Sequence, residues 1–495
     1  MAISKTDAGH CAEPPPTSVA QRAPDTFEHR VDAAIVGAGA AGLIAALAAA
    51  QAGATVMVFE RDRFASGSTS LSAGLIPAAG TRWQLASNIV DNPDLFAADI
   101  INKSHCDADF EIALHLAKTS AASLHWLADV CQVPLSLVDG FTYPGHQVRR
   151  MHGTPTRTGS EFLGALLAAC ERASIDIVTN ARVSDLYCHQ HVVSGLGCQH
   201  GNRHEVIGAD AVVLACNGYG ANRELVRRHI PEIEQAIYFG HPGNTGDAVL
   251  WAQQLGAGVG HMSAYQGHGS VAKPHGILIT WAVMMEGGIQ VNQQGNRFSN
   301  EHGGYSEQAV HVLKQPGGIA WNIFDQRIFD VAAQFDDFQQ AVKLGALIRA
   351  EDILSLASQT GLPKAQLQNT LAACHRFAGM PCSADDNATA TDPFGRFFDA
   401  SKLLKPPYYA VRVEAALFHT QGGVTVDHHA RVLNKQGGQV ICDGLYAAGG
   451  AAQGVSGDTV DGYLSGNGLL SAVTLGYLAG RHIGLRFNNT REQNV

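Results

Sequence analysis

The first patterned segment is residues 31–42, which read VDAAIVGAGAAG. Its apolar run predicts a short strand, and the glycines that follow have the Gly-x-Gly-x-x-Gly spacing of a dinucleotide-binding turn. In such a turn Gly37 permits the tight bend, Gly39 lets the backbone approach a pyrophosphate, and Gly42 lets the next helix pack on the strand. Ala41 stands within the same turn, at the helix N-terminus that would face the phosphates.

The residues after this turn complete a nucleotide-binding unit. An Ala-rich helix is predicted over 43–51, and a second strand over 55–59. Glu60 ends that strand, where a carboxylate can accept hydrogen bonds from ribose hydroxyls. Strand, helix, strand and acid occur in the required order, so the pattern indicates a dinucleotide site more strongly than three glycines alone.

Composition and charge exclude several classes of protein. The 495 residues are 46% hydrophobic and 16% charged, which is typical of a well-packed globular protein. The net charge is −10 and no block of like charges occurs, which argues against a nucleic-acid partner. No apolar run is long enough to span a bilayer, so no membrane span is expected. Residues 1–30 are predicted to be a disordered tail, and 486–495 a C-terminal tail.

The ten cysteines are scattered and form no CxxC pair. This usage predicts reduced core thiols in a cytoplasmic enzyme rather than a disulfide framework, a zinc ribbon or an iron–sulfur site. Cys374-His375 and His428-His429 lack a second ligand pair at a suitable spacing, so no metal site is predicted.

Two distant glycine-rich segments favour FAD over NAD. The first is residues 61–77, rich in Gly, Ser and Ala, and the second is residues 444–468. A long cofactor needs close backbone approach at two places. The alternative, that the C-terminal glycines only form turns, is left open by the residues alone.

Six blocks carry a resemblance to a known family. They are residues 68–74 (STSLSAG), 211–219 (AVVLACNGY), 244–247 (NTGD), 291–301 (VNQQGNRFSNE), 419–424 (HTQGGV) and 444–449 (GLYAAG). With them the chain resembles the fumarate reductase and 3-ketosteroid dehydrogenase flavoprotein superfamily over nearly all of residues 31–485.

The resemblance implies an α/β fold in two parts. A discontinuous, Rossmann-like FAD-binding domain would comprise 31–255 and 413–485, and an inserted α+β capping domain would comprise 256–412. Members with covalent flavin use a histidine in the segment equivalent to 66–77, and none stands here, so the FAD is expected to be non-covalent. The expected cofactor-binding residues are Gly37, Gly39, Ala41, Gly42, Glu60, Arg61, Ser68, Ser72, Gly74, Val183, Asp247, Gly450, Leu469 and Leu470.

The residues that carry fumarate reduction in this superfamily are replaced here. Trp281 stands where a relay glutamate is expected, and Met284 where a relay arginine is expected. Tyr305 occupies the place of the proton-donating arginine, and Tyr463 that of the carboxylate-clamping arginine. Fumarate reduction is therefore disfavoured.

The two tyrosines are similar to those of the 3-ketosteroid dehydrogenases. By this resemblance, Tyr463 would polarise a ketone and Tyr305 would remove the neighbouring proton, with Ser465 assisting either step. A tyrosinate base would need a pKa below the ordinary value of about 10. The alternative is that both tyrosines are core or turn aromatics.

Histidines suggest a second substrate group. His268, and His419 followed by Thr420, fall where fumarate reductases hold a substrate carboxylate. A cyclic ketone that also bears a carboxylate, such as an oxocyclohexanecarboxylate, would reconcile these histidines with the tyrosines. Alternatively, they are structural residues beside the flavin.

These patterns predict an FAD-dependent dehydrogenase that forms a C=C bond α,β to the ketone of a cyclic oxo compound, either a 3-oxosteroid or an oxocyclohexane. The alternatives are a fumarate reductase-like or tricarballylate-like oxidoreductase, and a flavoprotein without turnover of its own. The electron acceptor stays open: oxygen, a quinone, a dye-like carrier or a partner protein.

Overall fold

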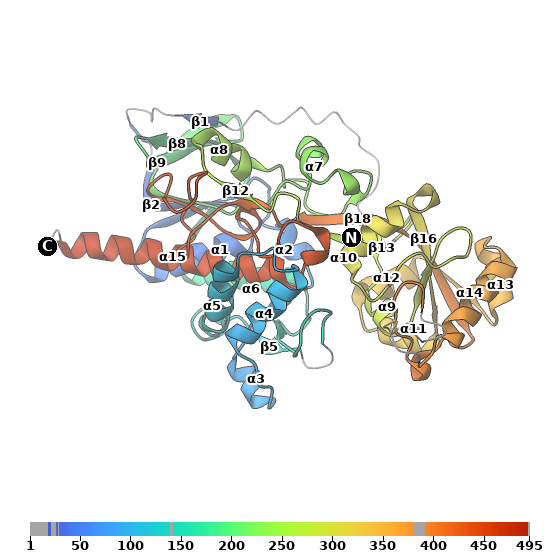
Figure 1. The fold of residues 1–495 in the computed structure, drawn as a ribbon. Helices are drawn as coiled ribbons and strands as arrows, with labels where there is room; N and C mark the ends of the chain where they lie inside the picture. Colours follow the sequence, from blue (N-terminus) through green and yellow to red (C-terminus); the bar gives the residue numbers. More distant parts are fainter. Residues whose placement is uncertain (1–17, 21–25, 28, 139–141, 380–391, 494–495) are drawn as a thin grey trace.

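Two hydrophobic cores organise the chain. The computed structural model describes residues 18–20, 26–27, 29–138, 142–379 and 392–493. One core gathers buried side chains from 33–214, 248–257 and 424–483, and the other gathers them from 219–233 and 265–417. Figure 1 shows the second part, yellow to orange, standing to one side of the first. We call them the nucleotide-binding part and the capping part.

The nucleotide-binding part is built on a mixed eight-stranded sheet. Its central pairs are parallel, and β8, β9 and β10 form an antiparallel meander at one side. In spatial order the strands are β1 (Ser18–Ala20), β8 (Ala181–His189), β9 (Val192–His200), β10 (Arg203–Leu214), β2 (His29–Val36), β3 (Val56–Phe59) and β7 (Asp176–Val178), with β20 (Leu445–Ala447) also on β10.

Two helices of small residues lie in close contact beside this sheet, α1 (Ala40–Gln51) and α15 (Asn467–Gln493). Figure 1 shows α15 as the long red helix crossing α1. A Cβ at Gly476 would lie 2.5 Å from the Ala41 carbonyl oxygen, and one at Gly480 would lie 2.3 Å from that of Ala45. Residues four apart share a helix face, so this spacing lets the backbone of α15 approach α1 directly.

The capping part is built on a second, seven-stranded sheet. Its long strands β13 (Tyr265–Ala272) and β18 (Tyr408–Thr420) are antiparallel neighbours, and β18 extends back to the junction with the nucleotide-binding part (Figure 1). The other strands are β14 (Ile277–Leu278), β16 (Ile319–Asp325), β15 (Ile289–Val291), β11 (Ile237–Tyr238) and β17 (Leu347–Ala350).

Further helices cover the two sheets, and two small sheets complete the fold. The helices are α2 (Gly67–Leu71), α3 (Arg82–Ala86), α4 (Pro93–Lys103), α5 (Phe110–Asp129), α6 (Gly159–Arg172), α7 (Arg223–His229), α8 (Asp247–Leu255), α9 (Ala282–Met285), α10 (Tyr305–Leu313), α11 (Gln326–Ala332), α12 (Asp336–Lys343), α13 (Ile353–Thr360) and α14 (Lys364–Arg376). The small sheets pair β12 (Val259–Gly260) with β19 (Gly423–Val424), and β4 (Ile76–Pro77) and β5 (Ser136–Leu137) with β6 (Met151–Gly153). Five 3₁₀ turns are η1 (Pro231–Ile233), η2 (Pro316–Gly318), η3 (Ala400–Lys402), η4 (Gly449–Ala451) and η5 (Val460–Gly462).

The structure differs from the predicted boundaries at several places, including residues 413–417, which were predicted in the nucleotide-binding part but contribute to the capping core. Residues 18–20 and 29–30, predicted as tail, form strands, while 1–17, 21–25 and 28 lie outside the described residues. Helix α15 runs to Gln493, through most of the predicted C-terminal tail. Residues 219–233, predicted in the nucleotide-binding part, contribute side chains to the capping core instead.

Two cysteines are paired across the sequence. Cys188 of β8 and Cys442, 254 residues apart, form a disulfide, so the prediction of reduced thiols is wrong for this pair. The described cysteines that remain free are Cys106, Cys131, Cys170, Cys198, Cys216 and Cys374. The prediction fails because the pairing joins distant segments that no local spacing reveals.

None of the described helices is both long enough and apolar enough to cross a membrane.

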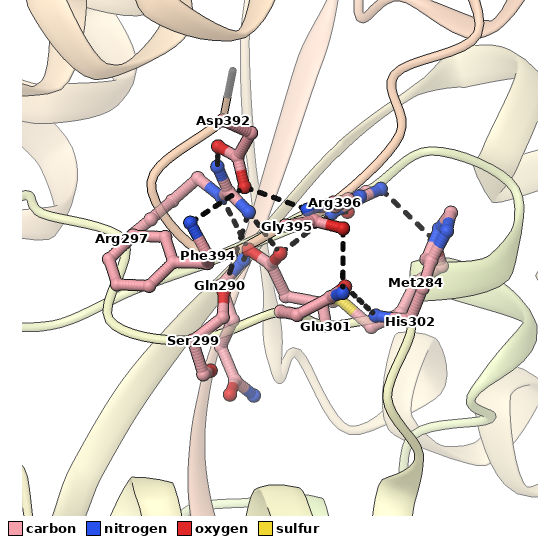
Figure 2. Close-up of polar contacts among 12 residues, drawn as sticks. Met284, Gln290, Arg297, Ser299, Glu301, His302, Asp392, Phe394, Gly395 and Arg396 are labelled. Atoms are coloured by element: carbon pink, nitrogen blue, oxygen red, sulfur yellow. Dashed lines mark hydrogen bonds and ion pairs between the residues drawn. The ribbon is translucent and has the colours of Figure 1, made fainter. Parts of the chain in front are cut away.

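A buried ion network stabilises the capping part (Figure 2). Both carboxylate oxygens of Glu301 accept hydrogen bonds from Arg297, at 2.8 and 2.7 Å, and one also accepts from Arg396 at 2.9 Å. Arg297 further donates to Asp392 at 2.6 Å. Burial alone would raise the pKa of Glu301, but the charge of Arg396 and the hydrogen bonds from Arg297 outweigh it and lower the pKa to about 2.

This network predicts a large effect of one substitution. Glu301→Gln leaves two buried guanidinium groups without their shared counter-charge, so the free energy of unfolding should fall by about 3–5 kcal/mol. Urea unfolding followed by tryptophan fluorescence measures it. Arg349→Met, which breaks the exposed pair with Glu351, is the matched control and should leave stability unchanged. Equal stability of the two variants would contradict the role given to Glu301.

Candidate active site

The glycine-rich turn after β2 is held from both sides. Gly37 has φ +107°, and a Cβ there would lie 2.6 Å from the Ala215 carbonyl oxygen, so only glycine fits. The backbone N–H of Ala38 donates to Oε2 of Glu60 at 3.1 Å, and that of Asp62 donates to Oε1 at 3.0 Å. Glu60 therefore fixes the turn while its remaining lone pairs stay available to a ribose.

The segment that contains Ser68 and the C-terminal glycine-rich segment 444–468 meet beside this turn. Ser68, on α2, accepts hydrogen bonds from the side-chain amides of Asn217 at 2.8 Å and Asn244 at 2.9 Å. A Cβ at Gly450 would lie 2.1 Å from Oδ1 of Asn217. Segments almost 400 residues apart in the sequence thus converge within one network, as a long cofactor requires.

The other predicted cofactor residues surround this network, but several are engaged with protein groups. Arg61 donates to the Gly243 carbonyl oxygen at 3.0 Å. The Ser72 hydroxyl accepts from the Gly74 N–H at 3.1 Å and closes the end of α2. Val183 is buried in β8. Asp247 begins α8, where burial raises the pKa of its carboxyl.

The start of α15 offers polar atoms without protein partners. Leu470 is fully buried and Leu469 packs against the same core. Beside them, Oδ1 of Asn467 and the hydroxyl of Ser471 are buried and lack a hydrogen-bond partner among the described residues. Because buried polar atoms are normally paired, these orphans fit the polar edge of a bound flavin.

Two tyrosines and a serine meet at the junction of the two parts. The hydroxyl of Tyr305, the first residue of α10, lies 3.1 Å from the Ser465 hydroxyl. The Tyr305 and Tyr463 rings are 6.3 Å apart, edge to face. These three residues line one cavity of about 10 Å³, whose described lining contains no arginine. The structure brings together the residues predicted to be catalytic.

The surroundings of both phenols oppose ionisation. Burial, together with the nearby Tyr463, raises the pKa of Tyr305 well above its ordinary value of 10, and the hydrogen bond to Ser465 only partly offsets this. Burial raises the pKa of Tyr463 to about 12. The protein therefore does not lower the pKa of Tyr305, as a resident tyrosinate would require.

His268 lies against the tyrosines as a neutral ring. It stacks on Tyr305 with ring centroids 5.2 Å apart, and its other aromatic neighbours are Phe418 and Trp281. Burial lowers the pKa of His268 to about 3. Its Nδ1 accepts from the Ser270 N–H at 3.1 Å, so the hydrogen of the neutral ring resides on Nε2.

His419 and Thr420 end strand β18. The His419 ring lies edge to face with Tyr463 at 5.6 Å, and burial lowers the pKa of His419 to about 4. Thr420 has a different environment, because its hydroxyl accepts from the Tyr219 N–H at 3.2 Å. Thr420 thus ties the end of β18 to the segment that follows the nucleotide-binding sheet, whose Tyr219 packs in the capping core.

The two residues at the relay positions carry no charge. Trp281 lies edge to face with Tyr305 at 6.4 Å, and its indole N–H has no described partner. Met284 is fully buried, and its carbonyl oxygen accepts a hydrogen bond from His302 at 3.0 Å. Neither side chain can pass a proton to Tyr305.

Residues outside the predicted set support Ser465. His146 donates from Nε2 to the Ser465 carbonyl oxygen at 2.9 Å. Arg150 supports His146 from the other side and forms fully buried ion pairs with Asp91 and Asp99. Tyr143 precedes them in the sequence and lies near enough to Tyr305 to contribute to the raised pKa of its phenol. In the sequence, Tyr143, His146 and His152 belong to an irregular segment, 141–155, that contains Pro and Gly and could reach the pocket, but spacing alone does not show that it does.

Two other features of the molecule lie outside the predicted site, a larger cavity and a surface cluster of possible metal ligands. A larger cavity of about 150 Å³ lies inside the capping part, lined by residues that include His302, Cys374 and Phe398, but it contains none of the predicted site residues. At the surface, ligand atoms of Asp107, His261 and Asp458 lie within 4.8 Å of one another. Hydrogen bonds within this group account for the arrangement.

Comparisons with known proteins show which family the chain resembles. A family model described as FAD binding domain matches residues 32–469. A probable fumarate reductase of Shewanella frigidimarina is 33% identical over 90% of this chain and 73% of its own length. The 3-oxosteroid 1-dehydrogenase of Mycobacterium tuberculosis is 26% identical over 91% of this chain and 98% of its own length.

A solved structure has the same fold. The open conformation of a flavocytochrome c3 fumarate reductase superposes with a TM-score of 0.76 at 32% identity, over 93% of this chain and 79% of that one.

The geometry of the glycine-rich turn predicts that one substitution, Gly39→Ala, weakens FAD binding without affecting folding. A Cβ at Gly39 would meet only the Thr69 hydroxyl, at an ordinary 3.5 Å, so Gly39→Ala should fold normally. The added methyl would occupy the space into which a pyrophosphate fits, so bound FAD, measured by absorbance after desalting, should fall about tenfold or more. Gly164→Ala, in open space on α6, is the control. Full FAD retention by Gly39→Ala would remove Gly39 from the cofactor site.

Proposed function

Because the chain belongs to the FAD binding domain family and is an FAD-dependent oxidoreductase acting on CH–CH bonds, we propose that it desaturates a cyclic ketone. In this reaction a C=C bond forms α,β to the carbonyl of a 3-oxosteroid or of an oxocyclohexane, with oxocyclohexanecarboxylates as the preferred class. A proton and a hydride leave adjacent carbons of the substrate.

One observation carries this proposal. Tyr305, Tyr463 and Ser465 line one cavity together with the Lys103–Glu307 ion pair, and no arginine is described there. Neutral donors suit a ketone oxygen, which has no full charge to compensate. A dicarboxylate would instead need guanidinium partners, which bind carboxylates in a bidentate manner.

Tyr463 is suited to polarise the carbonyl. Its phenol keeps the proton at neutral pH, because burial raises its pKa to about 12, and it can therefore donate to the ketone oxygen throughout the reaction. Electron withdrawal into that oxygen makes the neighbouring C–H more acidic. FAD, when bound, accepts the hydride from the β-carbon.

Tyr305 is suited to receive the proton from the α-carbon. Ser465 lies 3.1 Å from its hydroxyl and stabilises the phenolate by donating to it. Its raised pKa has a direct consequence: the phenolate is scarce at neutral pH, so the base becomes more available as the pH rises.

His268 and His419 are proposed to donate hydrogen bonds to a second substrate oxygen. Both rings are neutral, because burial lowers the pKa of His268 to about 3 and that of His419 to about 4. They lie on the two sides of the tyrosine pair, against Tyr305 and Tyr463 respectively.

A reductase or dehydrogenase of carboxylic acids is the second candidate. The likeness to fumarate reductases, at 33% and 32% identity, and the two histidines favour it. Trp281, Met284 and Tyr463 oppose it, because they supply no charge where a dicarboxylate or its proton relay would require one.

The proton transfer predicts a pH profile and a mutant phenotype. For wild type, kcat/KM for ketone desaturation should rise about tenfold per pH unit between about pH 7 and pH 10, without a plateau, because Tyr305 titrates above this range. Tyr305→Phe should retain FAD and lose turnover by a factor of about 1,000 or more. Stopped-flow reduction of the flavin at each pH measures both.

The matched control is Tyr187→Phe, a tyrosine of β8 in the other sheet, which should leave the profile unchanged. A plateau near neutral pH in wild type, or substantial turnover by Tyr305→Phe, would show that another group takes the proton.

Anaerobic flavin spectroscopy separates the two candidate functions. We expect 4-oxocyclohexanecarboxylate, cyclohexanone or a 3-oxosteroid to bleach the oxidised flavin band, and succinate to leave it unchanged. Fumarate, added to dithionite-reduced enzyme, should not restore the band. Reoxidation by fumarate together with no response to any ketone would establish the second candidate and overturn the first.

A further inference from the structure

The proposed site lacks a positive charge from its histidines. His268 and His419 are neutral donors, and the tyrosines add only hydroxyl groups. Transfer of a carboxylate from water into such surroundings is costly unless a cation accompanies it. A substrate that carries a carboxylate therefore needs a charged partner elsewhere in the cavity.

Lys103 is the one cation among the described residues that line the cavity of Tyr305, Tyr463 and Ser465. It ends α4 in the nucleotide-binding part, and its ammonium group lies 2.8 Å from a carboxylate oxygen of Glu307 on α10. Glu307 lines the same cavity, two residues after Tyr305. The ion pair thus bridges the two parts of the molecule at the proposed site.

This ion pair can exchange partners. The side chains of Lys103 and Glu307 are 18% and 19% exposed, so water still reaches both. The lysine side chain is long and flexible, and its ammonium group accepts any anion without fixed geometry. A second carboxylate could replace that of Glu307 while the ammonium stays paired, which avoids the cost of an isolated buried charge.

We propose that Lys103 binds the carboxylate of the substrate and that Glu307 occupies its place in the empty site. This inference rests on the proposed function, since it names the carboxylate-bearing members of the ketone class as substrates. The ketone would lie beside Tyr463 and the carboxylate beside Lys103, where α4 meets α10, in a cavity that has to widen from its volume of about 10 Å³ to admit the substrate. Lys103 becomes the residue that distinguishes a keto acid from an uncharged ketone.

A binding experiment without turnover tests the inference. Cyclohexanecarboxylate, which has no ketone to activate, and cyclohexanecarboxamide, its uncharged analogue, are titrated into the holoenzyme, and the shift of the flavin absorbance gives Kd. The variants are Lys103→Met, Lys103→Arg, Glu307→Gln and the double variant. Lys273→Met, which breaks a similar 2.7 Å pair with Glu414 away from the cavity, is the control.

The two members of the pair should act in opposite directions. Lys103→Met and the double variant should raise Kd for the carboxylate about 10- to 100-fold, with Kd for the carboxamide unchanged. Lys103→Arg, which keeps the positive charge, should leave Kd for the carboxylate near the wild-type value. Glu307→Gln should lower Kd for the carboxylate, because the Glu307 carboxylate no longer competes for Lys103. If the pair were purely structural, both Lys103→Met and Glu307→Gln would raise Kd for the carboxylate.

Equal losses for carboxylate and carboxamide, or weaker binding by both Lys103→Met and Glu307→Gln, would overturn the inference, as would no carboxylate binding by wild type. The proposed function is decided separately, by ketone bleaching of the wild-type flavin. Each can therefore fail without the other. The double variant keeps the test valid if Lys103→Met alone destabilises the fold by leaving Glu307 unpaired.

Discussion

The carboxylate of Glu301, enclosed by two guanidinium groups, holds the turn on which the candidate site depends. One of its oxygens also accepts from the backbone of Gln290, at 3.0 Å, in β15 of the capping sheet. Four residues later Tyr305 begins α10. Rigid attachment of this turn to the sheet therefore fixes where the Tyr305 hydroxyl lies. The Arg-Phe-Ser-Asn-Glu block that carries much of the family resemblance is, in this structure, a support for Tyr305, the proposed base.

Apart from the Lys103–Glu307 ion pair, the described residues that line the cavity of the candidate site carry no charge. Phenols that keep their protons and imidazoles that do not accept them provide directed hydrogen-bond donors in a poorly hydrated space, where such bonds are strong. The same property sets a limit, because a phenol that holds its proton is a weak base. In the proposed reaction, proton removal by Tyr305 would therefore be slow at neutral pH.

Features that depend on short segments of the chain could be predicted from the sequence. The glycine turn, Glu60 and the register of Tyr305 and Tyr463 each depend on short segments whose spacing is visible in the sequence, and the structure brings both tyrosines together. Contacts between distant segments were missed. The disulfide joins Cys188 to Cys442, and Ser465 is held by His146, 319 residues away. No periodicity or spacing encodes such pairs, because only the packing of complete elements brings them together.

Strand β18 gives the molecule a mechanical property. It pairs with β13 so that Gln266 opposes His419, and the Thr420 hydroxyl ties its end to Tyr219. Helix α10, which begins at Tyr305, packs against both β13 and β18 and so belongs to the same body as His268, whereas Ser465 lies in the nucleotide-binding part. The hydrogen bond between Tyr305 and Ser465 thus joins the two parts, so any change in their relative position would change the surroundings of the Tyr305 hydroxyl.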